Sequence, residues 1–290
     1  MTPIAVTIAG SDSSGGAGIQ ADLKTFSALG VYGASVIAAL TAQNTLGVQG
    51  VHDVPVDFIA QQMDSVFSDL AVNAVKIGML SRAEAVETVV EGLDRYSQEQ
   101  VVLDPVMVAK GGESLLEEDA VDALRTLLLP RALIITPNLA EAARLLEVDV
   151  AEDEDKMADQ AAALLDLGPR AVLLKGGHGT GAESADIFFD GGDPVRLAAA
   201  RTQTANTHGT GCTLSSAIAA GLAHGFDLLR AVAHAKAYVS EAIAHADVLV
   251  IGSGRGPVHH FHAIWGKVPM FGVLPGEAGD DPTGALHRLD

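Results

Sequence analysis

The feature that most constrains this chain is a regular alternation of short apolar runs with segments of helical periodicity. Residues 4–9, 74–77 and 101–103 form largely apolar runs, as strands do when both of their faces are covered. Between such runs, residues 56–70 carry apolar side chains at the three- and four-residue spacing of an amphipathic helix. The alternation predicts a doubly wound, mostly parallel α/β sheet with helices on both faces.

The same patterns predict the remaining elements. Further strands are expected at residues 34–41, 133–135 and 171–174, and further helices at 17–29, 83–93, from 138 onward, 155–167, 210–222 and 228–244. Two short apolar runs, 185–189 and 195–199, flank Asp190-Gly191-Gly192-Asp193 and predict a hairpin at the sheet edge. Residues 1–265 are expected to form one domain, and the aperiodic Gly-, Pro- and Asp-rich residues 266–290 a loosely ordered tail.

Composition narrows the setting in which the chain works. Cys212 is the only cysteine, so no internal disulfide can form and a reducing, cytoplasmic compartment is expected. Residues 1–8 lack the basic start of a signal peptide. The apolar stretches are interrupted well before the length of about 18 residues that a membrane helix needs, so no membrane partner is expected.

The charge of the chain is strongly acidic, with a net value of −19 from 18 basic and 37 acidic side chains. Such a surface repels nucleic acids and anionic membranes, which are therefore not expected as partners. It would also repel a nucleotide at long range. A site that handles phosphate would need local positive features that outweigh the overall field.

One segment offers such features: Asn206-Thr207-His208-Gly209-Thr210-Gly211-Cys212, at the start of a long apolar helix. Glycines let backbone N–H groups turn toward one point, where the helix start adds positive charge. A thiol in this first turn is expected to have a lowered pKa. The alternative is an ordinary Gly-rich turn before a buried helix, with an inert core cysteine. A P-loop is excluded, because the sequence has no Gly-Lys-Ser or Gly-Lys-Thr.

Polar and Gly-rich stretches follow the predicted strands at residues 10–18, 43–44, 78–79, 104–112, 136–138 and 175–181. In open α/β sheets, ligands bind beyond the carboxyl ends of the strands. We therefore expect these stretches to converge on a single active site.

Several motifs together resemble the hydroxymethylpyrimidine/phosphomethylpyrimidine kinases. In family order they begin at Ala9-Gly10-Ser11-Asp12-Ser13-Ser14-Gly15-Gly16-Ala17-Gly18, Ala42-Gln43-Asn44-Thr45, Lys76-Ile77-Gly78-Met79-Leu80, Leu103-Asp104-Pro105-Val106-Met107, Ile135-Thr136-Pro137-Asn138, Lys175-Gly176-Gly177-His178, Gly209-Thr210-Gly211-Cys212 and Gly256-Pro257-Val258-His259-His260. They span about residues 4–265. The resemblance implies a ribokinase-like homodimer that uses ATP and Mg²⁺ to phosphorylate 4-amino-5-hydroxymethyl-2-methylpyrimidine and then its monophosphate.

The resemblance also implies roles for individual residues. The implied substrate contacts are Gln43, Gly10, Ala17, Asp22, Met79 and Val106; the nucleotide contacts are Lys175, Thr207, Thr210 and Lys236; the metal contacts are Asp104, Asn138 and Glu141; and the catalytic positions are Gly209, Gly211 and Cys212 as base. The Gln43 amide carries a donor and an acceptor, which suits a ring nitrogen beside an exocyclic amine. Carboxylate oxygens such as that of Asp104 are ligands that hard cations prefer.

Plainer interpretations stand beside these roles. Asn138 and Glu141 also fit a helix capping box. Asp22 could instead favour a helix dipole, and Lys236 could be a solvated surface lysine. A mainly positional mechanism would need little help from Cys212 as a base. His259, His260 and His262 lack the spacing of a helical zinc site, so a structural role is expected.

Three other functions are weighed. Gly16-x-Gly18-x-x-Ala21 superficially fits a dinucleotide fingerprint, but the next strand ends without the ribose-binding acid, so an oxidoreductase is disfavoured. A binding protein without activity would be expected to have lost phosphate-site residues. The serious alternative is a pyridoxal kinase on the same fold.

Overall fold

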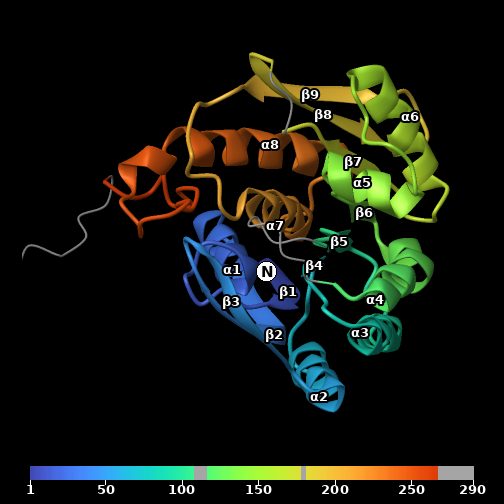
Figure 1. The fold of residues 1–290 in the computed structure, drawn as a ribbon. Helices are drawn as coiled ribbons and strands as arrows, with labels where there is room; N and C mark the ends of the chain where they lie inside the picture. Colours follow the sequence, from blue (N-terminus) through green and yellow to red (C-terminus); the bar gives the residue numbers. More distant parts are fainter. Residues whose placement is uncertain (108–115, 178–180, 267–290) are drawn as a thin grey trace, which may run out of the picture.

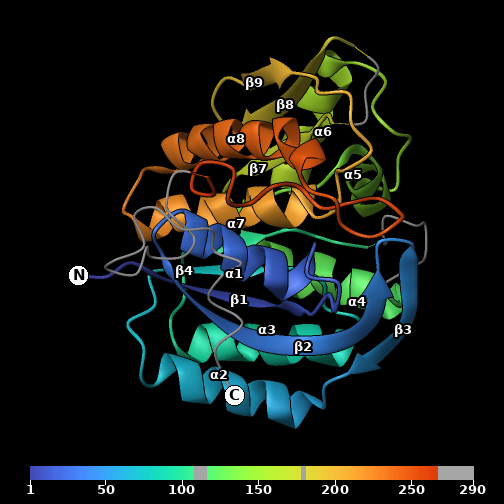
Figure 2. The ribbon, with the colours of Figure 1, turned by 90° about the vertical axis from the view of Figure 1, so that its left-hand side faces the viewer.

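The protein forms one nine-stranded sheet with helices on both faces (Figures 1 and 2). The structure, a computed structural model, describes residues 1–107, 116–177 and 181–266. The strand order is β3-β2-β1-β4-β5-β6-β7-β8-β9, so the first strand lies inside the sheet. The predicted fold class is confirmed. The tail expected at residues 266–290 lies outside the described residues except for Gly266, and the division into one domain and a tail stays a prediction.

The middle of the sheet is parallel. Its strands are β1 (Ile4–Gly10), β2 (Tyr32–Asn44), β4 (Ala74–Ile77), β5 (Val101–Leu103), β6 (Ile134–Ile135) and β7 (Val172–Lys175). At one side, β8 (Glu183–Phe189) and β9 (Val195–Ala200) form the predicted hairpin. At the other side, β3 (Gly47–Asp53) pairs antiparallel with β2 and was not predicted. Its two glycines and largely exposed side chains give it no apolar alternation.

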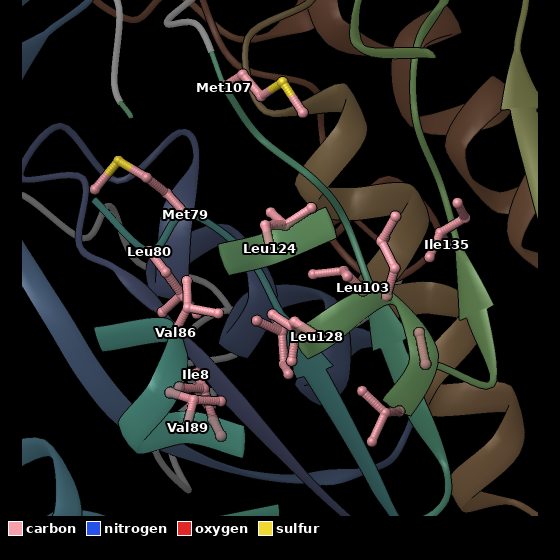
Figure 3. Packing of buried hydrophobic residues seen from close by; sticks show 14 of the residues in the cluster. Ile8, Met79, Leu80, Val86, Val89, Leu103, Met107, Leu124, Leu128 and Ile135 are labelled. Carbon is pink, nitrogen blue, oxygen red and sulfur yellow. The ribbon is translucent and has the colours of Figure 1, made fainter. Parts of the chain in front are cut away.

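Alternate residues of the parallel strands enter two separate cores. In β1, Ala5 packs on one face of the sheet, while Val6 and Ile8 pack on the other. Strand β5 divides in the same way, with Val102 on the first face and Leu103 on the second. Figure 3 shows part of the second core, where Ile8 and Leu103 lie among side chains from the covering helices. This two-sided burial explains why the strands read as continuous apolar runs.

The helices divide between these two cores. The first is covered by α1 (Gly18–Ala28), α7 (Thr210–Ala223) and α8 (Leu228–Ala244). The second is covered by α2 (Val56–Phe67), α3 (Ala83–Arg95), α4 (Glu118–Ala123), a short π-helical turn at Leu124–Leu128, α5 (Leu139–Leu146) and α6 (Glu154–Leu165). The sequence analysis missed α4. No helix in the described ranges is long and apolar enough to cross a membrane.

Helix α7 is buried along nearly its whole length, from Thr213 to Ala223. It packs against α1 and α8 and lies across β1, β4 and β5. Its alanine-rich sequence allows this close approach to the sheet. Because α7 is held on all sides, its first turn has a fixed position at the carboxyl edge of the strands.

Candidate active site

The start of α7 is shaped by Gly209, the residue before the helix. Gly209 has a φ of +77°, which L side chains rarely adopt, and a Cβ there would collide with the carbonyl oxygen of Gly16. The loop of residues 12–17 thus closes directly onto the helix start. The amides of the first turn have no acceptor inside the helix, so this end can bind an anion.

A buried ion pair lies against this helix start. Lys175, at the end of β7, places its Nζ 2.8 Å from Oδ1 of Asp104, which follows β5. Thr136 donates to the same oxygen at 3.1 Å. A Cβ at Gly211 would lie 3.2 Å from Asp104 Oδ2 and 3.3 Å from Lys175 Nζ. The structure therefore brings Asp104, Lys175 and Gly211 together at the carboxyl edge of the sheet.

The charges of this cluster depend on one another. Burial lowers the pKa of Lys175, but the Asp104 and Glu141 carboxylates raise it above its usual value overall. Burial raises the pKa of Glu141 to about 7, against the attraction of Lys175. Glu141 therefore titrates near neutral pH, whereas Lys175 stays positive.

Asn138 and Glu141 form the capping box that the sequence allowed. The Asn138 side chain accepts from the Glu141 amide at 3.0 Å, and the Asn138 amide donates to Glu141 Oε2 at 2.7 Å. This confirms the capping interpretation at the start of α5. Within the described ranges, no group of three or more His, Cys, Asp or Glu is arranged to hold a metal. The oxygens of Asp104, Asn138 and Glu141 still fit a Mg²⁺ that keeps most of its contacts to phosphate and water.

The predicted lowering of the Cys212 thiol pKa is wrong. Desolvation raises its pKa to about 11, and the opposing attraction of Lys76 is weaker. The helix start does not overcome this burial, so the thiol is protonated at neutral pH. The sequence places Cys212 in the first turn but gives no measure of how desolvated that turn is.

The expected substrate contact of Asp22 also needs correction. Its side chain is 0% exposed and is paired with Lys76 at 2.9 Å. Thr7 donates to it at 2.6 Å and Ser216 at 2.7 Å. Asp22 lies beyond the first turn of α1, so the helix-dipole alternative is wrong as well. This pair joins β1, β4, α1 and α7 beneath the site, and the only sequence signal was a lysine within an apolar strand.

Lys236 is not the solvated surface lysine that the alternative proposed. It is 8% exposed, and its Nζ lies 2.7 Å from Asp186 Oδ2. The other oxygen of Asp186 accepts from the Gly176 amide at 3.0 Å, next to Lys175. Lys236 is thereby connected to the loop after β7. This position is consistent with its predicted contact with the nucleotide, which stays a prediction.

Two of the residues implied for the ring pocket, Gly10 and Met79, meet at the end of β1. A Cβ at Gly10 would lie 2.6 Å from Met79 Cε, and Val106 packs beside the same core. Gln43, on β2, is half-buried, and its backbone N–H donates to Ser13 Oγ at 2.9 Å. Ala17 immediately precedes α1 on the loop that contacts Gly209.

A histidine that the sequence analysis did not single out joins the two ends of the site. His208, next to Gly209, places Nε2 2.8 Å from Asp12 Oδ2 and 3.4 Å from the Gln43 amide nitrogen. Asp12 and His208 are 196 residues apart in sequence, so no local pattern could have found the pair. Gln43 and Asp104 thus both lie close to the α7 start. Residues 108–112 and 178–180 of the expected polar stretches lie outside the described residues.

The fold and this edge of the sheet define a phosphotransferase of the ribokinase-like class. In keeping with it, the structure of pyridoxal kinase from Staphylococcus aureus in complex with AMP-PCP and pyridoxal has a TM-score of 0.83 and 33% identity, covering 90% of this chain and 94% of that chain. A family model described as phosphomethylpyrimidine kinase matches residues 12–259, and this chain belongs to that family.

Individual relatives agree with this membership. Hydroxymethylpyrimidine/phosphomethylpyrimidine kinase of Rhizobium meliloti is 62% identical over 265 residues, which cover 91% of this chain and 99% of the relative. The crystal structure of phosphomethylpyrimidine kinase from Clostridium difficile 630 is 46% identical, with a TM-score of 0.74, and the match covers 83% of this chain and 99% of that one.

Proposed function

We propose that this chain transfers the γ-phosphoryl group of ATP to the hydroxymethyl oxygen of 4-amino-5-hydroxymethyl-2-methylpyrimidine, and then to the monophosphate of that product. The observation that carries the proposal is the α7 start at Gly211, which lies against the buried Lys175–Asp104 pair. In a chain of this family, that arrangement would supply a local phosphate site on an otherwise acidic protein.

Phosphoryl transfer needs positioning and charge stabilisation more than covalent help from the protein. The amides at Gly209, Gly211 and Cys212 would bind the transferring group, and Lys175 would add a full positive charge beside them. A preorganised donor of this kind contributes about 3–4 kcal/mol to lowering a barrier. Thr207, Thr210 and Lys236 would complete the nucleotide side.

The acceptor would lie between Gln43 and the α7 start. Gln43 would bind the edge of the pyrimidine, and the walls of the pocket would come from Gly10, Ala17, Met79 and Val106. Cys212 would lie beside the hydroxymethyl oxygen. Because its pKa is about 11, the thiolate is a small fraction at neutral pH, and positional catalysis is the larger contribution.

Mg²⁺ would be held near Asp104, with Asn138 and Glu141 contributing through water. When bound, it would neutralise charge on the ATP phosphates. Asp104 is already paired with Lys175 through Oδ1, so its other oxygen Oδ2, near Gly211, is the one that faces this region. Glu141, with its pKa raised to about 7, would favour its charged form when a cation is near.

Pyridoxal is the competing acceptor, since a neighbouring structure of 33% identity is a pyridoxal kinase bound to pyridoxal. The 62% identity to a pyrimidine kinase favours the pyrimidine. The test is ADP release measured side by side with the hydroxymethylpyrimidine, its monophosphate and pyridoxal. We expect turnover of both pyrimidines; turnover of pyridoxal alone would replace this proposal.

The remaining features of the proposal follow from the family resemblance. Residues 1–265 would act as one catalytic domain, the protein would be a homodimer, and it would work in the cytoplasm. Sedimentation of the purified chain would test the homodimer.

A further inference from the structure

His208 is fixed from both sides by the polypeptide backbone. Its N–H donates to the Gly256 carbonyl at 3.0 Å, and its carbonyl accepts from the Val258 amide at 3.2 Å. The ring packs so closely on residue 16 that a Cβ there would collide with the imidazole. The side chain is 12% exposed. Its position is therefore set before any ligand arrives.

Asp12 determines which ring nitrogen carries the proton. Its carboxylate accepts from the Ser14 and Ala17 amides, at 2.8 Å each, and from the Gly16 amide at 3.1 Å. Although burial raises the pKa of Asp12, the hydrogen bonds from His208 and from the Ser14 hydroxyl and amide hold it well below its usual range. An ionised carboxylate only accepts hydrogen bonds, so the 2.8 Å contact requires a proton on His208 Nε2.

The same nitrogen faces Gln43. A nitrogen that donates to Asp12 has no lone pair left to accept from the Gln43 amide, 3.4 Å away. Across the described ranges, no other protein acceptor is paired with the Gln43 Nε2 group. Ser13 meanwhile holds the backbone of Gln43 through reciprocal bonds of 2.8 and 2.9 Å. The amide oxygen accepts from the Thr41 hydroxyl at 3.1 Å, so the part of the amide that the described residues leave unsatisfied is its N–H group.

We propose that Asp12 and His208 are positioning residues for substrate specificity: Asp12 fixes His208 as an Nε2–H donor, and a donor at this position cannot accept from the Gln43 amide, whose N–H groups are therefore left for the ligand. The ligand chemistry that satisfies them is a flat heteroaromatic ring with an acceptor nitrogen. This inference rests on the proposed function, because it assigns Gln43 to the ring end of that site.

A double-mutant cycle tests the proposal. His208→Ala is expected to raise the KM for the hydroxymethylpyrimidine about tenfold and to leave the KM for ATP within about twofold. Combined with Gln43→Ala, it is expected to add little, because His208 acts on the pyrimidine only through Gln43. Multiplicative effects, or an equal rise in the KM for ATP, would overturn the proposal.

The control is His224→Ala. His224 lies just after the other end of α7 and bonds to the Leu29 carbonyl at 2.8 Å. It is expected to leave both KM values unchanged. Thermal unfolding of each variant shows whether it has folded.

A second measurement needs no variant. In wild-type protein with ¹⁵N-labelled histidine, the His208 ring is expected to show a protonated Nε2 at pH 7–8. An unprotonated Nε2 would overturn the proposal even if His208→Ala fails to fold. Absence of pyrimidine turnover by the wild-type enzyme would instead overturn the proposed function, while the ring measurement still decides the Asp12–His208 pair.

Discussion

The two ends of the candidate site are built in different ways. At the phosphate end, charged side chains are buried: Asp104 is 2% exposed, and the Asp22–Lys76 pair beneath it is 0% exposed. At the ring end, Gln43 is half-buried on a hairpin whose tip residue Leu46 is 70% exposed. That end is ordered by hydrogen bonds from loops rather than by burial.

Because the two ends are built differently, we expect the phosphate end to determine the reaction rate and the ring end to determine which acceptor binds. Charges held in a fixed, poorly solvated place stabilise a developing negative charge strongly, because they need no rearrangement during the reaction. A hairpin held by a few hydrogen bonds tolerates change at lower cost and is better suited to select among acceptors. Changes at the phosphate end should therefore affect stability or kcat, and changes at the ring end should affect KM.

The largest expected effect is on folding. Lys76→Met leaves Asp22 buried without its cation and should lower the free energy of unfolding by about 3–5 kcal/mol. Denaturant unfolding at pH 7 measures this. Lys76→Met combined with Asp22→Leu removes both charges and should lose much less; equal losses would contradict a buried pair.

Next comes the charge at the phosphate end. Lys175→Met should lower kcat/KM by about a hundredfold to a thousandfold, because it removes the cation beside the α7 start and leaves Asp104 unpaired. Steady-state kinetics with ATP and the pyrimidine varied in turn measure the loss. Lys156→Met, an exposed lysine on α6, serves as the control and should be silent. A loss confined to the KM for the pyrimidine would break the comparison between the two ends.

At the ring end, Gln43→Ala should raise the KM for the pyrimidine about tenfold with kcat nearly unchanged. The isosteric Gln43→Glu should be worse, because a carboxylate offers the ring nitrogen no donor. Competition between pyrimidine and pyridoxal sharpens the result, since the preference for the pyrimidine should fall. An unchanged KM for Gln43→Glu would remove Gln43 from the ring end.

A smaller effect is expected at Cys212. Because desolvation raises its pKa to about 11, Cys212→Ala should reduce kcat by less than about tenfold at pH 7.5. Cys212→Asp tests whether a carboxylate, which is ordinarily ionised at neutral pH, speeds the reaction when it acts as a base in the same place. A kcat loss of more than about a hundredfold in the alanine variant, in folded protein, would establish a base role.

The smallest effect is a loss of stability in acid. Burial, with the Lys24 charge adding to it, lowers the pKa of His260 from 6.5 to about 3. As the pH falls below 6.5, His260 therefore binds a proton in the unfolded chain but not in the folded chain. The free energy of unfolding should consequently decline by about 1 kcal/mol between pH 7 and 5.5. Unfolding curves across this range measure the decline, and His260→Asn should flatten it. Because His260 lies 3.1 Å from Thr213 on α7, the phosphate end should loosen first.

The parallel strands at the middle of the sheet could be predicted, because strands buried on both faces consist of continuous apolar runs. Strand β3 could not, because Gly47 and Gly50 and its exposed residues leave no such pattern. Asp104 and Lys175 converge because both follow parallel strands. The degree to which a side chain is desolvated cannot be seen in a sequence. For this reason the predicted direction of the Cys212 pKa shift was wrong, and the buried Asp22–Lys76 ion pair was not predicted. The Asp12–His208 contact joins distant segments, and only the folded chain shows it.

Gly209 packs so closely on Gly16 that a side chain there would collide with it. This close contact between distant segments affects when the site can form during synthesis of the chain. Residues from both extremes of the chain must come together before the site exists, and Ser216 supplies the last hydrogen bond to the Asp22 carboxylate. A nascent chain of two hundred residues therefore contains all nine strands of the sheet but not α7, and so it has no catalytic centre. Activity should therefore appear only after α7 has been synthesised and has docked on the sheet.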